Sequence, residues 1–386
     1  MLNDKKIIPY GKQWIDNDDI EAVVEVLKSD RLTCGSKVDE FEKAIADYCD
    51  AKYAVAFSSG TAALHGAYFV LGIKQGDEVI TTPLTFSATA NGVVYCGGTP
   101  VFVDIKSDTL NIDPLKIEEK INPKTKAIAI MDFAGQPCDF DNIKAIAKKY
   151  NLPIVEDGAH ALGSEYKGQK IGSMADLTIL SFHPVKIITS GEGGMVLTNS
   201  QEFYEKLKVF RHHGIVKKPE AAPWYYEIEN IGYNYRLTDI HCALGLSQLK
   251  KLDKFVERRR EIVKKYQEAF GAMPEIILIK EEAFALTAWH IYPVQFDLIK
   301  LKIGRKEIFE RLGEKGIRCQ VHYVPVHYMP FYQKTFGYKK GDFPITEQYY
   351  ERAITLPLFP KLTNEEVEYV IETVKEIVDS NRPRPL

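Results

Sequence analysis

The sequence predicts an α/β protein in which a large, mostly parallel sheet is covered by helices and followed by a smaller α+β domain. The chain has 386 residues, more than one hydrophobic core usually supports, so two domains are expected. Strand-like and helix-like segments alternate between residues 53 and 198, which is typical of βαβ units. A long charged helix then ends this alternation. We therefore expect a large domain over residues 1–250 and a small domain over residues 251–386.

Two helices are expected before the first strand. Residues 16–29 carry acidic residues in the first turn and apolar residues at helical spacing, Ile20, Val23, Val24 and Leu27. A loop over residues 30–35 leads into a second helix at residues 38–48.

Apolar runs rich in β-branched residues predict the strands of the large sheet at residues 53–57, 78–82, 101–104, 126–131, 153–157, 177–182 and 195–198. Helical patterns between them predict helices at residues 61–71, 87–95, 114–121 and 142–149.

The charged helix spans residues 248–270. Its triple arginine, 258–260, is flanked by Glu257 and Glu261, so a solvated helix face explains it better than an anion site. Strands at 291–296 and 318–323 and helices at 305–315 and 364–379 complete the expected small domain.

Charge and composition argue against several classes of protein. The net charge of −3 favours neither a nucleic-acid nor a membrane partner, and no apolar run is long enough to span a bilayer. The N-terminal stretch lacks the apolar core of a signal peptide, so we expect a cytoplasmic protein. The six cysteines are scattered singly, without metal-ligand spacing, so no metal is expected.

A lysine stands where the strand 177–182 gives way to a glycine-rich turn, Gly191 to Gly194. Open α/β sheets bind ligands at such strand ends, and a partly desolvated lysine there can act as an amine nucleophile toward a carbonyl. Taken alone, Lys186 is more often an ordinary surface lysine.

Three further groups follow strands in the same way, and each has a bland alternative. The turn Ser58 to Leu64 could hold a phosphate at a helix N-terminus or be a simple helix cap. Phe86 could cover a flat ligand or belong to the core. Asp157, with His160 three residues on, could hold a proton on a ring nitrogen or cap a helix. Ser181 adds a possible phosphate donor.

The order of these groups is more specific than any one of them. A phosphate-binding turn, an aromatic ring, an aspartate after a strand and then Ser-x-x-x-x-Lys is similar to pyridoxal phosphate (PLP) enzymes of the aspartate-aminotransferase-like, type I fold. Over nearly its whole length the chain resembles the DegT-type nucleotide-sugar aminotransferases. The strings that carry the resemblance are SSGTAAL (58–64), TTPLTFSATAN (81–91), EDGAHALGSEYKGQKIG (156–172), SFHPVKIITSGEGG (181–194), RHHGIVKK (211–218), IGYNYRLTDIHCALGLSQLKKLD (231–253) and QVHYVPVH (320–327).

The resemblance implies a role for each site residue. Lys186 would bind the cofactor aldehyde covalently, Asp157 would hold the pyridine nitrogen, Phe86 would stack on the ring and His160 would lie near its phenolic oxygen. The phosphate would be held by Gly60, Thr61 and Ser181, with Asn234 reaching in from a second subunit of a homodimer. The nucleotide-sugar pocket would comprise Tyr10, Asp30, Arg31, Leu32, Thr33, Gln320, Val321, His322 and Tyr323.

Within the family, the chain is most similar to the UDP-4-keto-sugar aminotransferases of pseudaminic acid synthesis. That similarity implies amino transfer from L-glutamate to the 4-keto carbon of a UDP-linked 2-acetamido-2,6-dideoxy-hexos-4-ulose. Ile187, Gly60 and the pair Gln136-Pro137 depart from this subgroup, so another UDP-, dTDP- or GDP-4-keto-6-deoxy sugar of D configuration stays open. A lysine-lacking dehydratase is disfavoured by Lys186, and a non-catalytic cofactor-binding sensor is the alternative from another class.

Overall fold

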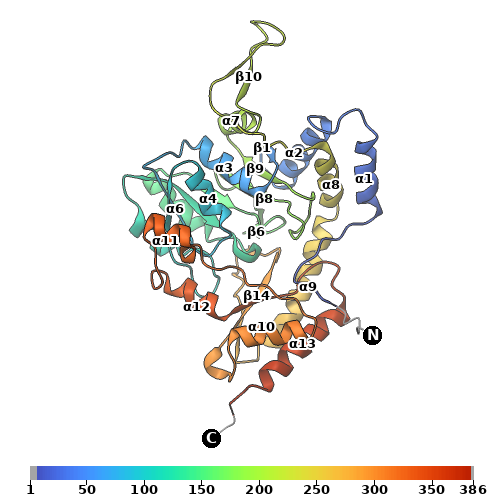
Figure 1. Ribbon diagram of the computed structural model, residues 1–386, viewed down its shortest axis with the longest axis vertical. Helices are drawn as coiled ribbons and strands as arrows, with labels where there is room; N and C mark the ends of the chain where they lie inside the picture. Colours follow the sequence, from blue (N-terminus) through green and yellow to red (C-terminus); the bar gives the residue numbers. More distant parts are fainter. Residues whose placement is uncertain (1–6, 384–386) are drawn as a thin grey trace.

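A computed structural model describes residues 7–383, and its central feature is a seven-stranded sheet (Figure 1). The strand order is β1-β9-β8-β5-β4-β2-β3. Strand β9 runs antiparallel to both of its neighbours, and every other pairing in this sheet is parallel. The strands are β1 (Tyr53–Phe57), β2 (Glu78–Thr81), β3 (Thr99–Phe102), β4 (Thr125–Met131), β5 (Ile154–Asp157), β8 (Leu177–Ser181) and β9 (Gly194–Thr198).

Helices cover both faces of this sheet, as its apolar strands require. One face packs against α3 (Gly60–Val70), α4 (Ala88–Tyr95) and α7 (Gln201–Arg211). The other packs against α2 (Ser36–Tyr48), α6 (Phe140–Tyr150) and α8 (Asp239–Leu249). Helix α1 (Asn17–Leu27) begins with a capping box between Asp16 and Asp19 and lies against α8. The expected mostly parallel α/β architecture is confirmed.

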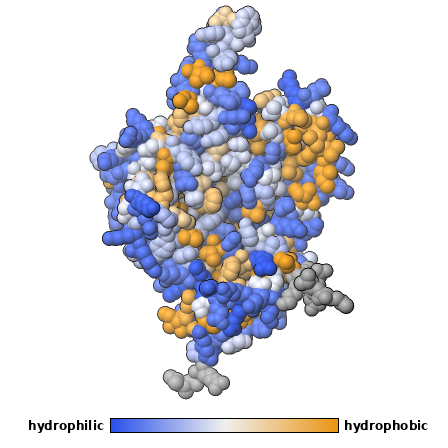
Figure 2. All heavy atoms as spheres, in the orientation of Figure 1, coloured by the Kyte–Doolittle hydropathy of each residue, from blue (hydrophilic) through white to orange (hydrophobic). Residues whose placement is uncertain are grey.

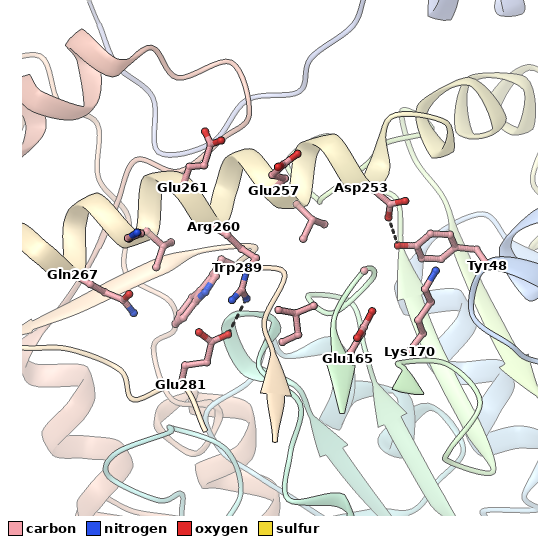
Figure 3. Close-up of a pocket in the computed structure, with 15 residues that line it drawn as sticks. Tyr48, Glu165, Lys170, Asp253, Glu257, Arg260, Glu261, Gln267, Glu281 and Trp289 are labelled. Atoms are coloured by element: carbon pink, nitrogen blue, oxygen red, sulfur yellow. Dashed lines mark hydrogen bonds and ion pairs between the residues drawn. The ribbon is translucent and has the colours of Figure 1, made fainter. Parts of the chain in front are cut away.

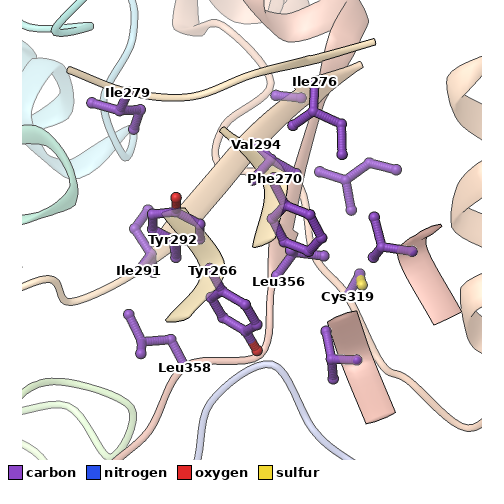
Figure 4. Close-up of a cluster of buried hydrophobic side chains, with 14 of the residues drawn as sticks. Tyr266, Phe270, Ile276, Ile279, Ile291, Tyr292, Val294, Cys319, Leu356 and Leu358 are labelled. Carbon is purple, nitrogen blue, oxygen red and sulfur yellow. The ribbon is translucent and has the colours of Figure 1, made fainter. Parts of the chain in front are cut away.

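The C-terminal part of the chain forms its own core around a three-stranded antiparallel sheet (Figure 4). Apolar side chains of three helices, including Tyr266 and Phe270, pack on its strands, which contribute Tyr292 and Val294. The strands are β12 (Ile276–Ile277), β14 (Tyr292–Phe296) and β15 (Ala353–Leu356), and the helices are α9 (Leu252–Phe270), α10 (Arg305–Glu314) and α13 (Asn364–Asp379).

The remaining elements are short. Helices α5 (Pro114–Ile117), α11 (Pro330–Phe336) and α12 (Pro344–Arg352) lie between the larger ones. Strands β6 (Glu165–Tyr166), β7 (Gln169–Lys170) and β13 (Ala285–Leu286) pair with each other. Strands β10 (Ile215–Lys217) and β11 (Tyr226–Ile228) form an arm that projects from the body (Figure 1).

The expected strand at 318–323 is wrong. This segment makes only an isolated bridge between Gln320 and Thr355, while β15 occupies the place beside β14. Two of its side chains, His322 and Tyr323, face a cavity instead of a neighbouring strand. Within residues 7–383, no helix combines the length and apolarity needed to cross a membrane.

The expected division at residue 250 falls between α8 and α9. The N-terminal segment nevertheless bonds to the C-terminal part, because Ile8 N donates to the carbonyl of Gly316 and Leu358 N donates to that of Tyr10. The division into two domains stays a prediction.

Candidate active site

A cavity of about 560 Å³ lies at the carboxyl ends of the parallel strands, where the C-terminal part covers them. This edge is where open α/β sheets bind ligands. Residues that follow β1, β2, β5 and β8 line one part of the cavity, and residues of the segment 320–329 line another. Most of the site residues expected from the sequence meet here: Tyr10, Gly60, Thr61, Phe86, Asp157, His160, Ser181, Lys186, Gln320, Val321, His322 and Tyr323.

Lys186 lies in the loop that joins β8 to β9, and its side chain is partly buried. Burial lowers the pKa of its amine to about 8, and the charge of Asp157 opposes this shift. A substantial fraction of the amine is therefore neutral near physiological pH, as a nucleophile toward a carbonyl requires.

Asp157 ends β5 and is only 4% exposed. Its carboxylate accepts hydrogen bonds from Thr89 Oγ1 at 2.5 Å and from the amide of Ala159 at 3.2 Å. Burial raises the pKa of Asp157, whereas these two donors and the charge of Lys186 lower it. Thr89 in turn contacts Thr85 Oγ1 at 2.6 Å. Sequence reasoning missed Thr89, which lies on α4 four residues after Thr85 of the preceding loop; that spacing was the available signal.

The N-terminus of α3 opens toward the cavity beside Ser181. Ser59 caps the helix by accepting a hydrogen bond from Ala62 N at 3.1 Å. A Cβ atom at Gly60 would lie 3.1 Å from that of Ser181, so the two backbones approach closely. Free helix amides and two hydroxyl groups, of Thr61 and Ser181, suit a phosphate.

A cluster of aromatic and imidazole rings forms another part of the cavity wall. Tyr323 Oη and His160 Nε2 are 3.0 Å apart, and the ring centroids of His160 and His290 are 4.4 Å apart. Burial and the charge of Lys186 hold the pKa of both histidines well below its usual range, so both are neutral. Phe86 is 57% exposed, which leaves a ring face open to a flat ligand. His290 belongs to no motif found in the sequence.

Two groups of expected residues do not line the cavity. Asp30, Arg31, Leu32 and Thr33 lie exposed in the loop after α1. Asn234 is exposed beside the arm, where its backbone bridges His212. A single chain therefore does not bring these residues to Lys186.

A second groove of about 660 Å³ lies along α9 (Figure 3). Two polar contacts join residues that line it: Arg260 contacts Glu281 at 2.9 Å, and Tyr48 donates to Asp253 at 2.6 Å. It contains none of the expected site residues, so the chemistry belongs to the smaller cavity. In the described part of the chain, no three His, Cys, Asp or Glu side chains are grouped to hold a metal ion.

Comparison with known proteins decides the family. The profile of the DegT/DnrJ/EryC1/StrS aminotransferase family matches residues 13–375. The chain belongs to this family. The spore coat polysaccharide biosynthesis protein SpsC of Bacillus subtilis is 45% identical over 96% of this chain and 97% of its own length. The UDP-4-amino-4,6-dideoxy-N-acetyl-beta-L-altrosamine transaminase of Campylobacter jejuni (strain 81-176) is 42% identical over 97% of this chain and 98% of its own length.

Solved structures agree with this assignment. Helicobacter pylori PseC, described as an aminotransferase involved in the biosynthesis of pseudoaminic acid, superposes with a TM-score of 0.92 at 37% identity, covering 97% of this chain and all of that one. The PLP-form of the putative sugar aminotransferase Spr1654 of Streptococcus pneumoniae superposes with a TM-score of 0.90 at 33% identity, covering 97% of this chain and 99% of that one.

This member of the DegT family is a PLP-dependent nucleotide-sugar aminotransferase with the α/β fold of PLP sugar aminotransferases. The expected family, fold and cofactor are confirmed. The cavity fits the cofactor: it offers a half-buried amine, a buried carboxylate, an open aromatic face and a helix N-terminus. PLP, when bound, supplies an electron sink for the carbon that carries the amine.

Proposed function

We propose that this enzyme transfers an amino group from L-glutamate to the 4-keto carbon of UDP-2-acetamido-2,6-dideoxy-β-L-arabino-hexos-4-ulose. The product would be UDP-4-amino-4,6-dideoxy-N-acetyl-β-L-altrosamine. Likeness to the Campylobacter transaminase of that name, over almost the full length of both chains, carries the proposal. The higher identity to SpsC (45% against 42%), whose name specifies no nucleotide sugar, favours keeping a D-configured UDP-, dTDP- or GDP-4-keto-6-deoxy sugar as the second candidate.

Lys186 has two tasks in this proposal. Its amine would hold the cofactor through the aldehyde group and, when free, would lie beside the carbon that bears the amine. There it removes a proton as a general base and returns it as a general acid. The lowered pKa of about 8 suits both directions, because both protonation states are populated near neutral pH.

Asp157 keeps a proton on the ring nitrogen of the cofactor, which preserves the electron sink. Thr89 and the amide of Ala159 fix its carboxylate. Gly60, Thr61 and Ser181 would hold the phosphate, Phe86 would cover the ring, and His160, whose Nε2 contacts Tyr323 Oη, would lie near the phenolic oxygen.

The sugar would be bound by polar groups of the segment 320–323 and of the N-terminal segment, which together line one part of the cavity. Tyr10 packs against His322 with ring centroids 5.5 Å apart, and Gln320 lies two residues before His322. Buried polar groups discriminate between epimers because a wrongly placed hydroxyl leaves them unpaired.

A second copy of the chain supplies Asp30, Arg31, Leu32, Thr33 and Asn234 in this proposal. Exposed apolar side chains on α1 and the loop after it, Ile20, Val24, Leu27 and Leu32, form a patch that a partner could cover (Figure 2). The arm exposes further apolar side chains, Trp224, Tyr226 and Ile228.

The deciding experiment compares kcat/KM for the L-arabino substrate, its D-xylo epimer and a dTDP-4-keto-6-deoxy sugar, each with L-glutamate. We expect the L-arabino epimer to be preferred at least about tenfold, a difference of about 1.4 kcal/mol in transition-state binding. A tenfold preference for either competitor would overturn the substrate and leave the aminotransferase intact.

A further inference from the structure

Two buried acids, Asp132 and Glu156, lie beside Asp157 in the chain fold but on the other face of the sheet. The register of β4 and β5 pairs Ile130 with Glu156 and Met131 with Asp157. Met131 and Asp157 line the cavity, so Glu156 points to the opposite face. Asp132 lies two residues after Ile130 and therefore shares that face with Glu156.

The two carboxyl groups are fully buried, each 0% exposed, and lie within hydrogen-bonding reach of each other. One oxygen of each carboxyl group accepts a hydrogen bond from a neighbouring residue. Asp132 Oδ1 accepts from Cys138 N at 2.9 Å, and Glu156 Oε2 accepts from Thr178 Oγ1 at 2.7 Å. The other oxygens, Asp132 Oδ2 and Glu156 Oε1, receive no hydrogen bond from any described residue.

We propose that Asp132 and Glu156 share one proton and act as positioning residues for Asp157. The inference rests on the proposed role of Asp157 at the cofactor nitrogen. The protonated member donates its O–H to the ionised member, which satisfies both remaining oxygens at once. Two ionised carboxylates in contact without water would repel each other strongly.

The surroundings of the pair support this assignment. The titratable groups that act on it are Cys138 and Asp157, with Asp139 and Cys49 nearby, and none of them can carry a positive charge. Burial raises the pKa of Asp132 well above its usual range and that of Glu156 to about 7.

The pair acts on Asp157 in two ways. The backbone N–H of Asp132 donates to the carbonyl of Asp157 at 3.2 Å, so Asp132 follows any shift of the end of β5, and the pair lies next to Asp157. The shared proton also limits the pair to a single negative charge. A second charge on that face would repel the carboxylate of Asp157 and favour its neutral form, which cannot hold the ring nitrogen protonated.

The first test looks for the proton directly. The infrared spectrum of the holoenzyme at pH 7 is expected to contain a protonated-carboxyl band that disappears in both Glu156→Gln and Asp132→Asn, because each amide replaces the shared proton with an N–H donor. Asp157→Asn serves as the matched control and is expected to keep the band. Absence from wild type of a band sensitive to these two substitutions would overturn the shared proton.

The second test follows the half-reaction with L-glutamate by cofactor absorbance as a function of pH. We expect the wild-type rate to fall at alkaline pH as the pair loses its proton, and the Glu156→Gln variant to lack this fall. Asp132→Asn is the substitute should the glutamine variant not fold. Superimposable pH profiles would overturn the positioning role. Failure of wild type to react with glutamate would instead overturn the proposed function, while the infrared band would still test the pair.

Discussion

Lys186 lies near Asp157 and three histidines, His160, His290 and His322, whose pKa values are lowered first by burial and then by the charge of Lys186. Histidines that stay neutral add no positive charge beside the amine. Burial therefore lowers the pKa of the Lys186 amine, and the carboxylate of Asp157 limits how far it falls.

The pH dependence of cofactor loading follows from this environment. Because only the neutral amine attacks an aldehyde, the rate at which cofactor-free enzyme combines with PLP should rise with pH and level off above about pH 8. Stopped-flow absorbance measures this rate. A midpoint at the ordinary lysine value of about 10.4 would contradict the burial of Lys186.

Thr89, like His290, was not found by sequence reasoning, and the role of its hydroxyl can be tested. Thr89→Val keeps the shape but removes the donor to Asp157 Oδ2, so the glutamate half-reaction should slow by about tenfold, the kinetic equivalent of one hydrogen bond to a charged group. Thr89→Ser keeps a hydroxyl and should stay near wild type. Equal rates for the valine and serine variants would show that the hydrogen bond does not matter.

At the scale of elements, the approach of α3 to the end of β8 forms the phosphate site. Gly60→Val should weaken PLP binding by about tenfold or more, because the branched valine side chain would push Ser181 away from the helix N-terminus. Gly60→Ala adds only the Cβ, 3.1 Å from that of Ser181, and should cost much less. Equilibrium titration with PLP measures both, and equal affinities for the two variants would refute the close-approach argument.

The elements also show what the sequence could predict. Apolar runs of β-branched residues predicted every strand of the large sheet, because burial on both faces leaves that pattern in each strand. The same pattern wrongly predicted a strand at 318–323, where His322 and Tyr323 face the cavity. Site residues that follow strands in recognisable motifs, such as Asp157 and Lys186, were predictable. His290 was not, since packing of the C-terminal part brings it to His160.

At the scale of the whole molecule, one chain leaves the proposed site incomplete. Asn234 and the loop after α1 lie away from the cavity of their own chain, and an apolar patch covers α1 (Figure 2). The homodimer proposed above, in which each chain completes the partner's cavity, would account for both features.

Hybrid dimers test this arrangement. Asn234→Ala and Lys186→Ala chains are each expected to be inactive alone. A mixed dimer should regain roughly one active site in two, because one cavity receives an intact Lys186 and an intact Asn234 from different chains. Mass spectrometry verifies the hybrids before the assay. Verified hybrids without activity would place Asn234 outside the partner's site.

The central claim is that the cavity around Lys186 carries out amino transfer, and one measurement tests it most directly. Purified Lys186→Ala is loaded with PLP and mixed with L-glutamate and the 4-keto sugar, beside Lys170→Ala, a lysine of the second groove, as control. We expect Lys186→Ala to bind PLP without forming any amino sugar and Lys170→Ala to match wild type. Amino-sugar formation by Lys186→Ala clearly above background would contradict the claim.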